Sequence, residues 1–311
     1  MESLVATALI GLSIGTQYAM ISIGFTLIFG IMGVINFAHG SGYVMGGYFA
    51  YVFTSLVGLP YPVAVVIAAL GTGVLGYVIE RVFIDKYVND HIATMIITLG
   101  LYLIITTGII LVFGPEPVDF RFPVSGSLRG EGFYIPYSTL IVLAVCSVAI
   151  GAVYWMIYRT RYGIALRAMA DNPKVATAQG IFPSQMFPMA FAIAMALAGL
   201  TGALVTPILV LEPNLGDAML MKSFIVVILG GLGSVTGATV EFTEVLMVAN
   251  GETGFVVGSV PELVAAVQRL PEISRRACRV RAENLFSAGP VVEAYLAIYR
   301  AMAERRRSKA S

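Results

Sequence analysis

Residues 92–113 read IATMIITLGLYLIITTGIILVF, an apolar stretch without a charged side chain. A helix needs about 20 mainly apolar residues to cross the hydrocarbon layer of a bilayer. Six further stretches qualify, at 4–30, 33–57, 61–79, 136–158, 185–210 and 220–240. Strands of a membrane barrel alternate apolar and polar residues over about ten positions, whereas these stretches are continuous and longer. The sequence therefore predicts an all-α polytopic membrane protein with about seven transmembrane helices.

The composition separates this chain from soluble proteins. Of its 311 residues, 58% are hydrophobic and only 12% are charged, and the mean hydropathy is +0.87. Soluble domains are about half apolar and about a quarter charged. A soluble enzyme, a disordered chain and a disulfide scaffold are therefore excluded for most of the sequence. The net charge of +1 provides no basic field that would attract a nucleic acid.

The charged residues divide the chain into two parts. Residues 1–240 contain 19 charged side chains, and the much shorter stretch 241–311 contains 18. The second part has the charge density of a soluble protein. Its sequence GFVVG at 254–258 is typical of a short strand, and Ser259 with Glu262 forms a capping box that opens a helix. We expect a membrane domain over 1–240 and a small soluble α/β fragment over 241–311.

Basic residues predict the orientation, because cytoplasmic loops of membrane proteins contain an excess of lysine and arginine. The loop at 114–135 has no such excess and is expected outside. Two other connections have it, through Arg81, Lys86, Arg159, Arg161, Arg167 and Lys174. Seven crossings then place the N-terminus outside and the tail in the cytoplasm. Because the start of the chain is not basic, we expect no cleaved signal peptide.

The run GVINFAHG at 33–40 is the most unusual part of the expected membrane region. It places Asn36 and His39 three residues apart, which puts them on one face of a helix. Polar groups inside a bilayer are costly, so they often mark functional sites. Two interpretations remain open. The run is either a broken helix that lines a pathway, or a structural turn whose polar groups satisfy each other.

The sequence gives no sign of catalysis or of a metal site. Glu80, Glu212 and Asp217 fall at the edges of expected spans or in loops, which weakens a carrier driven by protons or sodium. GLSIG at 11–15 has the spacing of a hydrolase motif but lies inside an apolar span. GGLGSVTG at 230–237 lacks the lysine of a nucleotide-binding loop. We therefore expect no enzymatic activity, cofactor or metal ion.

The connection at 159–181 is expected to contain a short helix outside the membrane. Ala165, Ala168 and Met169 would form a small apolar face beside Arg167. Such a face either docks in a groove of a soluble partner or belongs to a solvated connector.

Three motifs give the chain a family resemblance. RYGIALRAMADN at 161–172, with AQGI at 178–181, resembles the cytoplasmic coupling loop of branched-chain amino acid ABC transporter permeases. NFAHG at 36–40, followed by MGGY at 45–48, resembles the same family near its first spans. GGLGS at 230–234 resembles it near a late span. The three motifs occur in the family's order over residues 1–240.

The resemblance implies a multi-pass subunit of an ATP-driven importer in the bacterial inner membrane. The partners that it implies are a second related permease, two cytoplasmic ATPases, a periplasmic substrate-binding protein and membrane lipid. It implies a translocation region at Asn36, His39 and Gly40. It also implies an ATPase-coupling loop that includes Arg161, Gly163, Arg167, Ala168, Asp171, Asn172 and Gly180.

From about residue 241 the resemblance is to another family. NGETGFVV at 250–257, LVAAV at 263–267 and VVEAYLAIY at 291–299 resemble the C-terminal end of a GT-B (group 1) glycosyltransferase. The rest of such an enzyme has no room here, so we expect no sugar transfer. We interpret the tail as a join between two unrelated genes that impairs transport, with a diverged permease tail as the alternative. A membrane-anchored glycosyltransferase-like protein and a secondary carrier or channel are the alternative functions.

Overall fold

The computed structural model describes residues 2–88, 90–130 and 133–230, together with residues 269, 274 and 276. The chain divides into two units, Met1–Glu241 and Phe242–Ser311. Every helix and strand described below belongs to the first unit. The expected α/β fragment at 241–311, with its resemblance to a glycosyltransferase, lies outside the described residues except for these last three positions.

Five of the seven predicted spans are confirmed as helices long and apolar enough to cross a membrane. The first is residues Leu9–Met32 of α1 (Glu2–Met32). The second combines α3 (Tyr61–Ile79) with a π-helical turn η2 (Glu80–Ile84) and a 3-10 turn η3 (Asp85–Tyr87). The other three are α4 (His91–Phe113), α5 (Tyr137–Arg159) and α8 (Pro183–Val205).

The predicted span at 33–57 is not one continuous helix. Helix α1 ends at Met32, residues 33–38 are not helical, and α2 (His39–Tyr51) then leads into the π-helical turn η1 (Val52–Leu56). Gly33 causes the break, because its φ of +66° ends α1 in a left-handed conformation that favours glycine. Its amide donates to the carbonyl oxygen of Phe29 at 2.8 Å, which satisfies one of the last carbonyls of α1.

The predicted span at 220–240 also differs from the structure. The helix in this region, α9 (Leu215–Gly230), begins five residues earlier, and residues 231–240 lie outside the described part of the chain.

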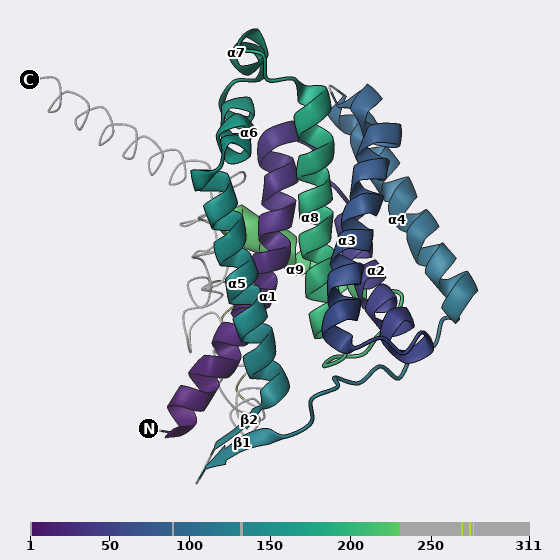
Figure 1. Cartoon of the computed structure of the whole chain (residues 1–311), viewed down its shortest axis with the longest axis vertical. Helices are drawn as coiled ribbons and strands as arrows, with labels where there is room; N and C mark the ends of the chain where they lie inside the picture. The colour runs from purple at the N-terminus through teal and green to yellow at the C-terminus, as the bar shows by residue number, and fades with distance from the viewer. Residues whose placement is uncertain are drawn as a thin grey trace, which may run out of the picture. The chain divides into compact units, whose positions relative to one another are not determined.

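The loops of the bundle gather at two opposite ends (Figure 1). The first turns of α1 lie at the lower end, near the antiparallel hairpin of β1 (Ser127–Gly130) and β2 (Phe133–Pro136). A bridge between Val118 and Leu211 joins the 114–136 connection to the chain after α8 at this end. The short helices α6 (Arg161–Asp171) and α7 (Pro173–Ala178) lie at the upper end. The basic connections of the sequence therefore share one end, away from the hairpin.

Helix α2 forms the interior of the bundle. Ten of its 13 residues are buried, so it packs against other helices rather than against lipid. Its neighbour is α8, and the contact depends on glycine: a Cβ on Gly46 would overlap the backbone of Gly199. A Cβ on Gly202 would likewise overlap the carbonyl of Tyr43. Small residues let membrane helices approach closely, and here they bring α8 onto α2.

Candidate functional site

Asn36 and His39 lie in the interior of the bundle, at the break between α1 and α2, and both are fully buried. The Asn36 Oδ1 atom accepts a hydrogen bond from the amide of Ala38 at 3.0 Å. The His39 Nε2 atom lies 2.9 Å from the carbonyl oxygen of Ile21 on α1. Each side chain therefore bonds to main-chain groups near the break. Of the two interpretations left open by the sequence, these contacts favour a structural turn, although its polar groups do not bond to each other.

Two neighbouring helices fix the broken segment. The amide of Phe37 donates to the Thr98 hydroxyl of α4 at 3.3 Å. A Cβ built on Gly24 of α1 would lie 2.9 Å from the imidazole of His39 and 2.8 Å from the carbonyl of Ala194 on α8. The start of α2 is thus held between α1, α4 and α8. It lies at the depth of the middle of α1.

Gly40 brings α9 against this break. A Cβ on Gly40 would lie 2.6 Å from the carbonyl oxygen of Gly216, and a Cβ on Gly216 would lie 2.5 Å from that of Gly40. The two helices therefore touch backbone to backbone at this pair. Because Gly40 is level with the middle of α1, the first turn of α9 also lies inside the bundle and not at its end.

Lys222 of α9 is a charged residue that the sequence reasoning missed. Its ammonium donates to the Tyr18 hydroxyl of α1 at 3.0 Å and lies 5.2 Å from the centre of the Tyr18 ring. Asp217, in the first turn of α9, lies beside the hydroxyl of Tyr102 in the middle of α4. The missed signal was the lysine itself, which is a rare residue within an apolar helix.

Glu80, which was expected at the edge of a span, directly follows α3. The residue is fully buried in the π-helical turn η2. Neither carboxylate oxygen has a hydrogen-bond partner among the residues that the structure describes. The helical segment that contains the apolar span continues through this turn to Tyr87, although residues 80–87 include four charged side chains. In the same described part of the chain, no three His, Cys, Asp or Glu side chains gather as a metal site.

The connection between α5 and α8 folds into α6 and α7. Thr160 caps α6, because its hydroxyl accepts from the amide of Gly163 at 3.0 Å. A Cβ on Gly163 would overlap the carbonyls of Met156 and Ile157, so glycine lets α6 fold back closely on the end of α5. Asn172 caps α7 by accepting from the amide of Val175 at 3.2 Å. Gly180 follows α7 with a φ of +85°.

The inner and outer faces of α6 differ from the sequence-based expectation. Gly163, Leu166 and Met169 are buried against the bundle. The predicted docking face of Ala165, Ala168 and Met169 is therefore wrong in its largest member, since Met169 is fully buried and both alanines are half-buried. The large apolar side chains that are exposed in the connection between α5 and α8 are Ile164, Val175 and Phe182. Arg161, Arg167 and Asp171 are exposed beside them.

Helix α6 contacts three membrane helices. The Tyr162 hydroxyl donates to the carbonyl of Met186 on α8 at 3.1 Å, and burial raises the pKa of this phenol. Leu166 and Arg167 line a small crevice together with Leu27 and Ile31 of α1. The Arg167 guanidinium lies over the Tyr158 ring of α5, 5.0 Å from its centre. A force on α6 therefore reaches the last two turns of α1.

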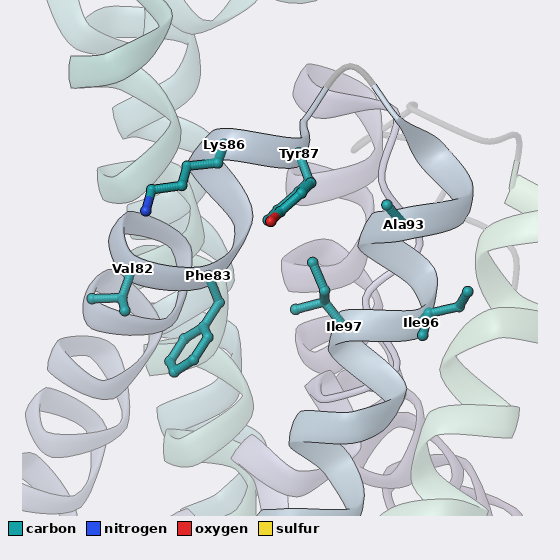
Figure 2. A pocket seen from close by; sticks show the side chains of 7 residues that line it. All are labelled: Val82, Phe83, Lys86, Tyr87, Ala93, Ile96 and Ile97. Atoms are coloured by element: carbon teal, nitrogen blue, oxygen red, sulfur yellow. The ribbon is translucent and has the colours of Figure 1, made fainter.

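Two larger clefts do not fit an amino acid. One, of about 510 Å³, lies between the end of the α3 span and the start of α4, where Lys86 and Tyr87 are its polar lining residues (Figure 2). The other, of about 400 Å³, lies between α3, α5 and α8 and has an almost wholly apolar wall. The hydroxyl of Tyr61 in its wall already donates to the carbonyl of Ala203 at 2.9 Å. Ligand sites place several polar groups around one point, and neither cleft does so.

Comparison with known proteins gives the family. The chain matches the branched-chain amino acid transport system / permease component family over residues 7–270. It is 30% identical over 246 residues to the high-affinity branched-chain amino acid transport system permease protein BraD of Pseudomonas aeruginosa, covering 73% of this chain and 79% of that protein. The high-affinity branched-chain amino acid transport system permease protein LivH of Escherichia coli K12 is 30% identical over 249 residues, or 74% and 80% of the two chains.

A third relative is archaeal. The probable branched-chain amino acid transport permease protein LivH of Methanocaldococcus jannaschii is 31% identical over 275 residues, or 81% of this chain and 85% of that protein. No solved structure matches the chain. The family match ends at residue 270, whereas the sequence analysis expected the resemblance to stop near residue 240. With three-quarters or more of each relative covered, the chain belongs to the branched-chain amino acid transport permease family, whose members are membrane transport subunits and not enzymes.

Proposed function

We propose that this chain is a membrane subunit of an ATP-driven importer for branched-chain or related amino acids. The observation that supports this most directly is its 30% identity to permeases named for high-affinity branched-chain amino acid transport. The partners of the proposed importer are a second related permease, two cytoplasmic ATPases and a periplasmic substrate-binding protein. Membrane lipid surrounds the spans. The proposed location is the inner membrane.

In this proposal α6 and α7 form the surface that contacts an ATPase. Arg161, Arg167 and Asp171 supply exposed charge for that contact. Half-buried Ala168 keeps this side of α6 small, and the exposed apolar contacts come from Ile164 and Val175. Three further residues determine the conformation of this surface. Gly163 lets α6 fold onto α5, Asn172 caps the start of α7, and Gly180 follows its end. A helix that presents such a mixed face suits a groove on a soluble partner.

The translocation region is proposed at the break between α1 and α2. Asn36 and His39 are buried and hydrogen-bonded to main-chain groups. We therefore propose that they stabilise the non-helical conformation of the break. Gly40 allows α9 to touch the break. Broken helices near the middle of a membrane are a common feature of transport sites, because they bring backbone polar groups to the pathway.

The proposed orientation places α6 and α7 in the cytoplasm and the N-terminus and hairpin outside. Its support is the placement of Arg81, Lys86, Arg161, Arg167 and Lys174 in connections at the end of the bundle opposite the hairpin. The tail after residue 241 is likewise proposed to be cytoplasmic.

The coupling surface is tested by reversing one charge at each end of the bundle. The full chain is reconstituted with the second permease, the ATPases and the binding protein, and ATP-driven leucine uptake is measured. Arg167→Glu is expected to lower uptake about tenfold, as expected for losing one charged contact. Arg121→Glu makes the same change on an exposed arginine in the 114–136 connection and is expected to have little effect. Equal effects of the two variants would refute the assignment of α6.

For the tail, we propose a glycosyltransferase-like fragment, joined near residue 241, that has no transferase activity. Its support is the order of the motifs at 250–257, 263–267 and 291–299, of which only the last lies beyond the permease-family match at 7–270. Replacing 241–311 with the C-terminal segment of Escherichia coli LivH is expected to raise leucine uptake. Turnover of a sugar nucleotide by the purified chain would instead favour a membrane-anchored transferase. Uptake in vesicles without ATP and ATPases would favour a secondary carrier or channel.

A further inference from the structure

We propose that the ammonium group of Lys222 binds the carboxylate of the transported amino acid inside the membrane. This inference rests on the import function proposed above and adds a substrate contact to it. It concerns one side of α9, formed by Asp217, Met221, Lys222 and Ile225, which we call the α9 face. All four residues of the α9 face are exposed.

Lys222 lies deep in the expected hydrocarbon layer. Its ammonium is 3.0 Å from the hydroxyl of Tyr18, which belongs to the span Leu9–Met32. At 1.5 Å per residue, Tyr18 is about 14 Å from one end of that span and about 21 Å from the other. The hydrocarbon core is about 30 Å thick. A lysine at this depth has no short route to the headgroup region.

The other side of α9 is packed, so the α9 face is its open side. The Ser22 hydroxyl of α1 donates to the carbonyl of Ser223 at 3.3 Å. The rings of Phe25 and Phe224 meet edge to face at 5.8 Å between their centres. These contacts hold α9 against α1. The Lys222 ammonium lies at the edge of this interface between the two helices, where it contacts Tyr18. The ammonium is thereby fixed in position while its outer side stays accessible.

The α9 face is unsuited to lipid. It contains an ammonium and, one and a half turns earlier, the carboxylate of Asp217. Charged residues inside a membrane are costly and face a water-filled cavity or another protein group. The α9 face therefore borders either the translocation pathway or the second permease.

The chemistry of the substrate favours the pathway. An ammonium group has three donors, and the Tyr18 hydroxyl accepts one of them. Within the described part of the chain, the two ion pairs are Arg81–Asp85 and Arg121–Asp119, so Lys222 has no carboxylate partner there. An amino acid in transit brings a carboxylate of the complementary charge. Charge-assisted hydrogen bonds of this kind are among the stronger polar contacts in proteins.

The first experiment measures water access at Lys222. Lys222→Cys is made in a full chain whose Cys146 and Cys278 are replaced by alanine, and a membrane-impermeant cationic thiol reagent is applied to the reconstituted complex. Ile104→Cys on α4 is the control, because Ile104 is 69% exposed on an apolar helix surface. We expect rapid modification of the cysteine at 222, slowed by leucine with its binding protein, and slow modification at 104. Equal slow rates would overturn the inference.

The second experiment measures transport. Lys222→Met is expected to lower leucine uptake by about 10- to 100-fold, the range for losing a charged hydrogen bond. Lys222→Arg is expected to restore part of it. Attaching an aminoethyl group to Lys222→Cys should also restore uptake, whereas an uncharged methylthio group should not. Subunit assembly and basal ATP hydrolysis should stay unchanged, which separates loss of a substrate contact from loss of structure.

The outcomes distinguish this inference from the proposed function. Normal uptake by Lys222→Met overturns the substrate contact and leaves the import function intact. Failure of Lys222→Met to assemble with the second permease overturns it as well, because the ammonium then pairs with that subunit. If the version with the C-terminal segment of Escherichia coli LivH in place of 241–311 also imports no leucine, although the cysteine at 222 reacts rapidly, the import function itself is overturned.

Discussion

Replacing Gly40 with alanine should separate α2 from α9 and destabilise the bundle. The new Cβ would lie 2.6 Å from the carbonyl oxygen of Gly216 and 3.1 Å from the Cβ of Leu220. Ordinary contacts begin near 3.4 Å, so the helices must move apart by about 0.8 Å (3.4 minus 2.6). Because the obstacle is backbone and not a flexible side chain, we expect an overpacking cost of about 1–3 kcal/mol.

Helix propensity opposes this loss of stability, because alanine is favoured over glycine inside a helix. A control variant must therefore gain the same propensity without a clash. Alanine is up to about 1 kcal/mol better than glycine inside a helix. A Cβ added to Gly108 on α4 would have no neighbouring atom within 4 Å in the described part of the chain, so Gly108→Ala should gain this term without a clash. Both variants gain this term, so their free energies of unfolding should differ by the overpacking cost alone, about 1–3 kcal/mol.

The measurement is reversible unfolding in mixed micelles, followed by far-ultraviolet circular dichroism. Gly216→Ala makes the reciprocal contact, since its Cβ would lie 2.5 Å from the Gly40 carbonyl. Once the helices have moved apart to accommodate the methyl group of one alanine, adding the methyl group of the second alanine costs less free energy. The double variant should therefore lose less stability than the sum of the two single losses. Equal stabilities for Gly40→Ala and Gly108→Ala, or strict additivity of the pair, would refute the backbone contact between α2 and α9.

Three further outcomes follow from local contacts. Gly163→Ala should displace α6 from α5 and uncouple ATP hydrolysis from uptake, whereas Gly108→Ala on α4, whose Cβ would meet no described atom within 4 Å, should keep the two activities coupled. Asn172→Ala removes the cap of α7 at a cost of about 1 kcal/mol, so hydrogen exchange of the α7 amides should become about fivefold faster; unchanged exchange would argue against the cap. Glu80→Gln should raise the free energy of unfolding by about 1 kcal/mol, because it replaces a buried carboxylate that lacks a partner among the described residues; a loss of stability would reveal a partner.

The sequence predicted the long helices because lipid imposes one simple requirement. A continuous apolar run must become a helix, since the backbone finds no other hydrogen-bond partners in hydrocarbon. The runs at 61–79, 92–113 and 136–158 illustrate this, and each became a helix within a few residues of its expected bounds. This requirement constrains the length and composition of a membrane-spanning segment. It does not predict where a helix is interrupted.

The break at 33–38 shows where that argument stops. The run at 33–57 is apolar enough for a span, but Gly33 in a left-handed conformation ends α1, and Asn36 bonds to the amide of Ala38. Both features were visible as an unusual run of residues. Their geometry was not, because the segment is held by Thr98 and Met195, which are far away in the sequence.

The segment at 161–171 is a short helix, as predicted from the sequence, but the direction of its apolar face was not predicted correctly. The sequence-based argument grouped Ala165, Ala168 and Met169 as the outer face because they are apolar and adjacent. The bundle offers α6 a second apolar surface at the end of α1, and the larger side chains Leu166 and Met169 turn toward it. Hydrophobicity alone does not distinguish a helix face that binds a partner protein from one that packs against its own helix bundle.

Helix α1 connects the two regions to which function is assigned. Near one end, Leu27 and Ile31 line the crevice against Leu166 of α6, and further along Tyr18 contacts Lys222 of α9. The two contacts are separated by about 14 Å along the helix axis, counting nine residues from Tyr18 to Leu27. In the proposed importer, an ATPase bound to α6 would displace α1, and Tyr18 and the start of α2 would move with it because both contact α1. The glycine contacts at Gly40 and Gly46 leave α2 little free volume in which to absorb such a movement. The close packing of the interior therefore provides a physical means for ATP-driven motion at the surface to reach the charged face of α9.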